Sequence, residues 1–362
     1  MTQDDLKVSD EEFFSGLSNR IAPPDAAARQ AALDKWNSVA KPIGSLGVLE
    51  DDVIRIAALT GSADVAIGKR TVVVLCADNG VVAQGVTQCG QDVTLAVAVN
   101  VAHGVSSVCM MAHAVGAEAL AADMGMAGPC PEKGVIDFAV ARGTNDITQG
   151  PAMTRAQAIQ AIRSCIDLVG DLKARGYQLI ASGEMGIGNT TTSSAMTAVL
   201  LDMPVEEVTG RGAGLSDDGL SRKVEAIKRA IQVNEPDPTD PLDVLCKLGG
   251  FDIAGLVGLF IGGAIHRVPV IVDGCISALA AYTAQLMCPE CVCAMLASHV
   301  SAEPAAQIVM ERLGLDPVIQ AGMRLGEGTG AVCLIPMLDA ALALYNGTTF
   351  EATGIDAYEV DL

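Results

Sequence analysis

Short apolar runs alternate with longer amphipathic stretches along most of this chain. The apolar runs end in glycine or polar residues and lie at residues 70–78, 117–125, 134–141, 177–184, 268–274 and 292–299. Segments of helical length lie between most of them, and residues 154–176 are one example. Strands that alternate with helices pair in parallel, so the pattern predicts an α/β fold with a parallel sheet of about six strands and crossover helices.

The two ends of the chain have a helical pattern without strands. Residues 10–60 show helical spacing, and the chain returns to helix from about Ala331. The sequence therefore predicts a small helical domain at residues 1–62, joined by C-terminal helices at residues 331–362. A sheet domain is predicted at residues 63–330. Within it, the proline-rich acidic segment "NEPDPTDPLD" is interpreted as a rigid surface connection.

The composition indicates which residue types form the core and which classes of molecule the chain can bind. Half of the residues are apolar but only 3% are aromatic, so we expect a core of small aliphatic residues. The formal net charge of −20 repels nucleic-acid backbones and anionic membrane surfaces. We therefore expect no nucleic acid and no membrane as partner. An anionic small substrate has to be held by local N–H groups and a few basic residues.

The sequence predicts a cytoplasmic protein. The acidic N-terminal segment lacks the basic, apolar and small-residue order of a secretory signal. The apolar run at residues 253–265 is shorter than the roughly 20 residues of a membrane span, so it predicts a buried helix. Eleven scattered cysteines favour reduced thiols over a disulfide framework.

Three glycine-rich segments, at residues 183–191, 209–223 and 324–331, carry the candidate chemistry. None matches a phosphate loop or a dinucleotide fingerprint, and each one alone is compatible with a simple turn. In the first segment, glycines leave backbone N–H groups uncovered, and Asn189 and Thr190 can cap a helix whose N-terminus attracts anions. This segment therefore predicts a phosphate-binding site.

Two of these segments place a glutamate between glycines, at Glu184 and Glu327. In a pocket that excludes water the charged form of a carboxyl is disfavoured, so its pKa rises and it becomes a usable general base. Glu327 is the better candidate, because Asn and Thr residues near Glu184 can hydrogen-bond to that carboxylate. A turn carboxylate that points to solvent is the alternative interpretation of Glu327.

Polar residues follow several predicted strands, where open α/β sheets bind ligands. They are Asp78, Glu184, Asp273, Ser298 and His299. A metal site at Cys288, Cys291 and Cys293 is conceivable, but the segment continues into a predicted strand and buried thiols are the favoured interpretation. The four histidines show no metal-binding spacing, so we predict neither a metal nor another cofactor.

Several motifs, in order, carry a family resemblance. They are "KPIGSLGVLE", "CADNGVVAQGV", "GEMGIGNTTTSSA", "GRGAGLSDDGLSRK", "GGFDIAGLVG", "PVIVDGCISALAA", "ASHVSAEPA" and "GMRLGEGTGA". From about Lys41 to about Leu338 the chain resembles the nicotinate mononucleotide:5,6-dimethylbenzimidazole phosphoribosyltransferases of cobamide biosynthesis. The resemblance implies a Rossmann-like parallel sheet with a small helical domain, and a homodimer. It also implies transfer of phosphoribose from nicotinate mononucleotide to an aromatic lower-ligand base, which gives an α-riboside 5′-phosphate and nicotinate.

The resemblance assigns roles to particular residues. Glu327 in "RLGEG" is implied to take the proton from the incoming base. The residues implied to bind ribose and phosphate are Gly186, Gly188, Asn189, Thr190, Lys223, Asp273 and Ser301. Nicotinate attached through its ring nitrogen is a cationic leaving group, so its release needs no metal. A carboxylate such as Glu184 can stabilise the positive charge of the oxocarbenium-like transition state.

The chain departs from the usual family pattern around the expected acceptor pocket, which includes Asp78. Asn79 replaces a usual His, Gly90 a usual Pro, Cys89 a serine that contacts benzimidazole in some members, and Cys275 a common Phe. We therefore expect a broadened or shifted choice of acceptor. One relative within the family uses phenol or p-cresol and has two homologous subunits. Phenolic acceptors, another benzimidazole, a purine, a heterodimer and a non-catalytic partner subunit are open alternatives.

Overall fold

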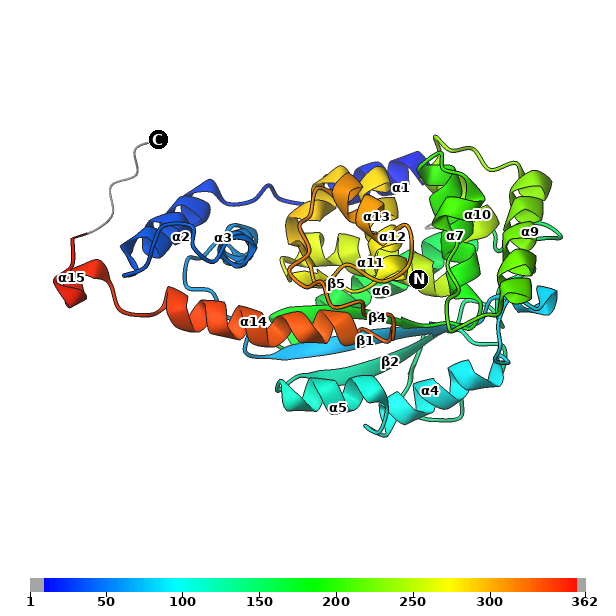
Figure 1. The fold of residues 1–362 in the computed structure, drawn as a ribbon, viewed down its shortest axis with the longest axis horizontal. Coiled ribbons are helices and arrows are strands. Elements are labelled where there is room, and N and C mark those ends of the chain that lie inside the picture. Colours follow the sequence, from blue (N-terminus) through cyan, green and yellow to red (C-terminus); the bar gives the residue numbers. More distant parts are fainter. Residues whose placement is uncertain (1–9, 357–362) are drawn as a thin grey trace.

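The structure, a computed structural model, describes residues 10–356 and contains one six-stranded parallel sheet (Figure 1). In chain order the strands are β1 (Arg70–Ala77), β2 (Glu118–Gly125), β3 (Ile136–Asp137), β4 (Leu179–Met185), β5 (Val270–Val272) and β6 (Met295–Ala297). In space their order is β3-β2-β1-β4-β5-β6. The strand order reverses direction between β1 and β4, which is the Rossmann arrangement and places the ligand-binding crevice at the carboxyl ends of these two strands.

Each of the six predicted apolar runs contains a strand, so the predicted α/β fold is confirmed. The strands at the sheet edges are shorter than the runs that predicted them. In the last run, the 3-10 helix η3 (Pro289–Ala294) precedes a strand of three residues. The long central strands are mostly apolar because both faces of the sheet are covered by helices, and the last seven residues of β1 are all buried.

One face of the sheet is covered by α6 (Arg155–Ala174), α11 (Phe251–His266) and α12 (Cys275–Met287) (Figure 1). Helix α11 contacts α6, α12 and the central strands, and its residues from Phe251 to Ala264 are all buried. The apolar run at residues 253–265 is therefore a core helix, as its length predicts. Asp252 is the only charged residue before the last turn of this helix, which makes it an unusual component of the core.

The opposite face is covered by α4 (Asp92–Ala102), α5 (Ser107–Ala114) and α14 (Thr329–Tyr345) (Figure 1). Within residues 10–356, the stretch Asp92–Ala114 is the one segment long and apolar enough for a membrane span by length and composition. It consists of two helices separated by a turn, and both pack on the sheet, α4 on β1 and β2 and α5 on β2. One third of its most apolar window is buried.

The remaining helices surround the carboxyl ends of the strands or connect the layers. They are η2 (Gly80–Gln84), α7 (Asn189–Leu200), α8 (Val205–Val208), α9 (Asp217–Asn234), α10 (Pro241–Leu248) and α13 (Ala306–Leu313). Helix α7 begins directly after β4 and α14 begins beside β4 and β5, so two helix N-termini face the same end of the sheet.

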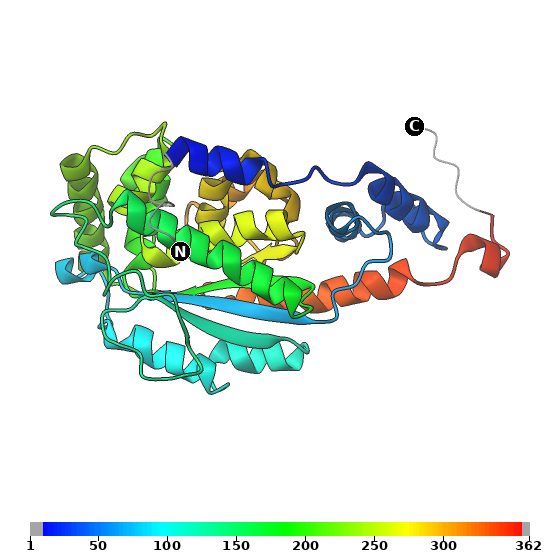
Figure 2. The same cartoon turned by 180° about the vertical axis from the view of Figure 1, so that it is seen from behind.

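The three N-terminal helices do not all lie together in space. Helices α2 (Ala26–Ser38) and α3 (Val48–Thr60) pack on each other and against the end of α14, where the Trp36 and Tyr345 rings lie 4.9 Å apart. Helix α1 (Asp10–Ser18) lies instead over the large sheet domain, which Figure 2 shows from behind. Its Ser18 hydroxyl lies 3.2 Å from the Cys288 sulfur. Residues 1–9 and 357–362 of the predicted helical domain lie outside the described residues.

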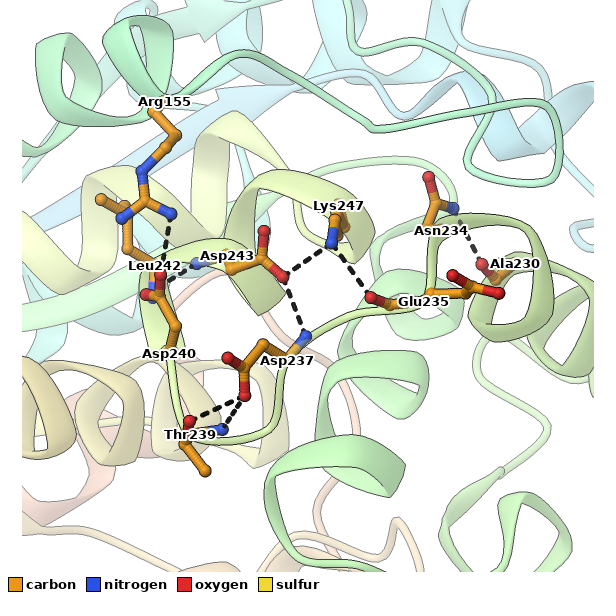
Figure 3. Close-up of polar contacts among 10 residues, drawn as sticks. All are labelled: Arg155, Ala230, Asn234, Glu235, Asp237, Thr239, Asp240, Leu242, Asp243 and Lys247. Carbon is orange, nitrogen blue, oxygen red and sulfur yellow. Dashed lines mark hydrogen bonds and ion pairs between the residues drawn. The ribbon is translucent and has the colours of Figure 1, made fainter.

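The acidic connection between α9 and α10 makes polar contacts with its own backbone and with the neighbouring helices (Figure 3). Asp237 accepts hydrogen bonds from the Thr239 N–H at 2.9 Å and from the Thr239 hydroxyl at 2.7 Å. Asp240 caps α10 and forms an ion pair with Arg155 at 2.9 Å, and Lys247 forms an ion pair with Asp243 at 2.9 Å. The rigidity expected from its proline and acid content stays a prediction.

Candidate active site

A cavity of about 200 Å³ lies at the carboxyl ends of β4, β5 and β6. Its walls come from segments far apart in the sequence. They are residues 86–88, the end of β4 with the start of α7, residues 211–215, residues 273–277 after β5, and residues 323–330 before α14. This is the edge where an open α/β sheet places its ligand, and all three glycine-rich segments contribute residues to the cavity walls.

The segments that carry Glu184 and Glu327 lie backbone against backbone. A Cβ added to Gly183 would lie 2.7 Å from the Glu327 carbonyl oxygen, and one added to Gly328 would lie 3.0 Å from the Ser182 carbonyl oxygen. Glycine is therefore required at both positions for β4 and the start of α14 to approach this closely. Glu327 itself has a φ of 60°, a left-handed conformation that is strained for a residue with a side chain.

Glu184 is buried with only 9% of its surface exposed, and its pKa is raised to about 8. Burial is the main cause, and the Asp252 carboxylate is the next, since two like charges close together cannot both ionise easily. Asp273 and Glu327 raise the pKa further, while a hydrogen bond from the Asn189 amide lowers it. The sequence argument that favoured Glu327 over Glu184 as the general base did not include the acids around Glu184, because only the fold brings these acids together.

Glu327 lines the cavity, and burial raises its pKa, as its glycine-rich surroundings predict. The backbone N–H of Val108, at the start of α5, acts in the opposite direction and lowers this pKa. The Oε2 atom of Glu327 is buried and has no hydrogen-bond partner. A half-buried carboxyl with one free oxygen beside a cavity has the geometry and the proton affinity of a general base.

The start of α7, where the sequence predicts an anion-binding site, borders the cavity. Its N-cap is Gly188 with a φ of 95°, and Thr190, Ser193 and Ser194 line the cavity. Lys223 is fully buried behind Thr190, and its ammonium donates to the Thr190 hydroxyl at 2.9 Å and to a backbone carbonyl at 3.0 Å. Burial lowers the pKa of Lys223 to about 8. The Thr190 hydroxyl therefore lies between the Lys223 ammonium and the cavity.

Asp273 and His299 lie together at the ends of β5 and β6 and both line the cavity. Asp273 accepts a 2.8 Å hydrogen bond from the backbone N–H of Ala331. Burial raises the pKa of Asp273, and the neighbouring His299 opposes this effect. The Nδ1 atom of His299 lies 3.0 Å from the Ser298 hydroxyl. Ser301 also lines the cavity, so Asp273 and Ser301 are both placed where the sequence expects them.

The four residues predicted for the acceptor pocket have different positions. Cys275 lines the cavity, and burial raises the pKa of its thiol to about 12. Asp78 and Asn79 are buried beneath it, and Asp78 accepts from the Thr94 hydroxyl at 2.7 Å and the Ala127 N–H at 2.8 Å. Cys89 is exposed next to Gln88, which does line the cavity. In this structure Asp78, Asn79 and Cys89 are not among the lining residues.

The cluster Cys288, Cys291 and Cys293 lies in η3, away from the cavity. Cys288 and Cys291 are fully buried, and burial raises the pKa of all three thiols. Between residues 10 and 356 no group of three or more His, Cys, Asp or Glu side chains is arranged to hold a metal ion. His299 belongs to the cavity instead.

Several residues at or near the cavity were not singled out from the sequence, among them Gln88, Arg211 and Asp252. Arg211 and Gln88 line it, and the Gln88 amide donates to the Gly214 carbonyl, which joins two loops at the cavity mouth. Asp252 lies beneath it and shares the Asn189 amide with Glu184. The sequence did carry a signal for Asp252, which is a lone acid at the start of a 16-residue apolar helix. A carboxyl buried in such a helix needs hydrogen-bond partners.

A family model described as phosphoribosyltransferase matches residues 21–355. A nicotinate-nucleotide–dimethylbenzimidazole phosphoribosyltransferase of Acetivibrio thermocellus is 45% identical over 326 residues, which cover 90% of this chain and 93% of the relative. One of the same name from Ruminiclostridium cellulolyticum is 44% identical over 347 residues, 96% of this chain and 99% of the relative. The crystal structure of CobT from Thermus thermophilus matches with a TM-score of 0.86 and 35% identity, covering 91% of this chain and 99% of that one.

The Rossmann strand order and the cavity define a nucleotide-binding α/β protein, and the comparisons define its class as a phosphoribosyltransferase. The chain belongs to the phosphoribosyltransferase family whose members include the nicotinate-nucleotide–dimethylbenzimidazole enzymes. The resemblance found in the sequence motifs is thereby confirmed.

Proposed function

We propose that this chain transfers phosphoribose from nicotinate mononucleotide to a benzimidazole-type base, in the activation of a cobamide lower ligand. The products are nicotinate and an α-riboside 5′-phosphate. The observation that carries the proposal is the pair of buried carboxyls, Glu184 and Glu327, in one cavity beside the start of α7. Near-complete coverage of relatives that carry this activity in their names supports it.

In the proposed reaction a ring nitrogen of the base attacks the anomeric carbon of the ribose. The bond from that carbon to the nicotinate nitrogen breaks, and its electron pair neutralises the cationic ring. Attack from the face opposite to nicotinate inverts the anomeric carbon. Glu327 accepts the proton that the base loses, while the Glu184 carboxylate faces the developing positive charge. The cationic ring lowers the pKa of Glu184 on binding and so favours its charged form.

The phosphate is proposed to bind at the start of α7, with Gly186, Gly188, Asn189 and Thr190 on one side. Lys223 supplies positive charge through Thr190, and Ser301 and Arg211 complete the surroundings. The Arg211 guanidinium is half exposed, donates to the Leu215 carbonyl at 2.8 Å and forms an ion pair with Asp217. In the proposal it exchanges these contacts for the phosphate, because a guanidinium matches phosphate geometry well.

The alternative role as a non-catalytic partner subunit is not favoured, because the chain keeps both carboxyls in the cavity and its named relatives are enzymes. We propose a homodimer in the cytoplasm, as the family resemblance implies. Val105 and Met110 are 55% and 66% exposed at α5, which provides apolar surface for such a contact. The division into a helical domain and a sheet domain is likewise a proposal.

The test is a transfer assay with the purified chain, nicotinate mononucleotide and 5,6-dimethylbenzimidazole. We expect release of nicotinate in equal amounts with the α-riboside 5′-phosphate, identified by mass and by comparison with an authentic standard. The chain without a base is the control for hydrolysis. Absence of nicotinate release with every base tested would contradict the proposed function. Sedimentation of the same preparation measures the oligomeric state.

A further inference from the structure

The Asn189 side chain joins two buried carboxyls. Its amide nitrogen donates to Glu184 Oε2 and, at 2.9 Å, to Asp252 Oδ2. Asp252 is fully buried at the start of α11, and Asn189 is the first residue of α7. The two hydrogens of one amide group are thus shared between a carboxyl that faces the cavity and one that lies beneath it.

The Asp252 carboxyl occupies space that side chains at Gly186 and Gly250 would fill, and its Oδ1 atom is buried without a hydrogen-bond partner. A Cβ added to Gly186 would lie 2.4 Å from Asp252 Oδ2, and one added to Gly250 would lie 2.4 Å from Asp252 Oδ1. The same point beside Gly250 lies 2.6 Å from Asn79 Oδ1, so the Asn79 amide shares the space around Asp252. The two glycines therefore leave room for the carboxyl, and its Oδ2 atom orients the Asn189 amide by accepting the 2.9 Å hydrogen bond.

Asp252 acts on Glu184 in two ways. Through Asn189 it fixes the direction from which Glu184 accepts a hydrogen bond, and its negative charge opposes ionisation of Glu184. The other acids that face Glu184 are Asp273, after β5, and Glu327, before α14. Asp252 is the strongest of these three influences and does not line the cavity.

We infer that Asp252 is a positioning residue for the transfer reaction, which holds Asn189 and thereby sets the orientation and the ionisation of Glu184. This inference rests on the proposed function. It assigns Gly186 and Gly250 a further role, because their missing side chains leave room for the Asp252 carboxyl. The Asn189 side chain is then a connector between two carboxyls.

The decisive variants are Asp252→Asn and Asp252→Ala. In the Asp252→Asn variant an amide oxygen still accepts from Asn189, so turnover is retained within about threefold. The lost negative charge moves the pH at which Glu184 ionises downward, and the pH profile of kcat shifts with it. In the Asp252→Ala variant the Asn189 amide is released, and we expect kcat to fall by about 10²-fold with a smaller change in KM, the scale of a misplaced catalytic group.

Asp123→Asn is the matched control. Asp123 is also a buried acid at the carboxyl end of the sheet, but its Oδ1 accepts from the backbone N–H groups of Gly125 and Met126, and its Oδ2 faces the Arg142 guanidinium at 3.4 Å. The same charge change there should leave the pH profile of kcat where it is. A profile of Asp252→Asn that coincides with that of the unaltered chain would overturn the inference, and so would an Asp252→Ala variant with full turnover. An inactive but folded Asp252→Asn variant would also overturn it, since the charge itself would then be required.

Asn189→Ala keeps the inference testable if the Asp252 variants fold poorly. It removes the connector without changing the charge, and we expect a fall in kcat close to that of Asp252→Ala. In the double variant that combines Asn189→Ala with Asp252→Ala, kcat should fall no further than in either single variant, because both substitutions break the same Asn189–Asp252 hydrogen bond. Multiplied losses would overturn the inference. Absence of nicotinate release by the unaltered chain is a different result, and it would contradict the proposed function instead.

Discussion

Gly183 and Glu327 contact each other backbone to backbone, so that a Cβ on Gly183 would lie 2.7 Å from the Glu327 carbonyl oxygen. This contact sets the relationship between the two carboxyls of the site, because the residue after Gly183 is Glu184. One carboxyl is almost fully buried among other acids, and the other has a free oxygen and a strained backbone. Two neighbouring carboxyls with different surroundings can take two different roles in one reaction.

Replacing Glu327 with Gln tests its role as the general base. The amide keeps the size of the side chain but cannot accept the proton, so we expect turnover to fall by about 10²-fold or more. Folding should be unaffected, as judged by circular dichroism and thermal melting. A Glu327→Gln variant that turns over at the normal rate would remove Glu327 from this role.

Replacing Lys223 with Ala tests the phosphate-binding site. Lys223 supports Thr190, so we expect its loss to weaken binding of nicotinate mononucleotide by about 1.5 to 3 kcal/mol, the contribution of a charge-assisted hydrogen bond. Nicotinate riboside, which lacks the phosphate, should bind the variant and the unaltered chain alike. Calorimetric titration of both ligands measures the difference. Equal losses for the two ligands would show that Lys223 does not act on the phosphate.

The raised pKa of Glu184 predicts a dependence of folding stability on pH. The folded-state pKa of about 8 lies above the unfolded value, so the folded protein retains a proton that the unfolded chain has released. The stability contributed by this proton is complete below about pH 4.5 and is lost progressively as the pH rises to about 8. Denaturant unfolding measured across this range checks the sign.

Asp252 and Asp52, with pKa values raised to about 6 and about 7, contribute in the same direction. The Glu184→Gln variant isolates the part that belongs to Glu184. Its stability should fall less steeply between pH 4.5 and 8, by at most about 1.4 kcal/mol per pH unit, the limit for one proton. If the free energy of unfolding changes with pH in the same way in the variant and in the unaltered chain, the raised pKa of Glu184 is contradicted.

Chelation tests the prediction that no metal takes part. Because the leaving group is already cationic, transfer should continue at an unchanged rate after dialysis against a strong chelator. Added zinc or magnesium should not increase the rate. A loss that zinc restores would direct attention to Cys288, Cys291 and Cys293.

The acceptor choice is predicted to be shifted or broadened by the cysteine at position 275. Cys275 lines the cavity, where a phenylalanine would supply an aromatic wall. Initial rates with 5,6-dimethylbenzimidazole, benzimidazole, adenine, phenol and p-cresol measure the preference. A phenol has a pKa near 10, so its deprotonation by Glu327 is harder and its rate should rise more steeply with pH.

The Cys275→Phe variant provides the comparison, and we expect it to narrow the preference toward flat bicyclic bases. Strong preference of the unaltered chain for 5,6-dimethylbenzimidazole over the other four bases would contradict the prediction. Loss of all activity in a folded Cys275→Phe variant would show instead that the larger ring blocks the cavity.

The sequence by itself determined the class of fold and the approximate positions of its central strands, because periodic apolar patterns are local and survive without knowledge of the neighbours. It also identified Glu184 and Glu327 as glutamates in glycine-rich segments, and it predicted an anion-binding site at the start of α7. These are properties of a few consecutive residues, and the motifs that contain them are long enough to identify the family.

Only the tertiary structure decided which of these residues share one cavity and how strongly each carboxyl is perturbed. The pKa of Glu184 depends on Asp252, which is 68 positions away in the chain. Asp252 comes close because α11 packs against β4 and because Asp252 accepts a hydrogen bond from Asn189 at the start of α7. Asp78 and Asn79 follow β1 as predicted, yet the fold buries them below the cavity. Burial and Coulomb interactions act over a few ångströms in space, and distances between remote segments are absent from a sequence pattern.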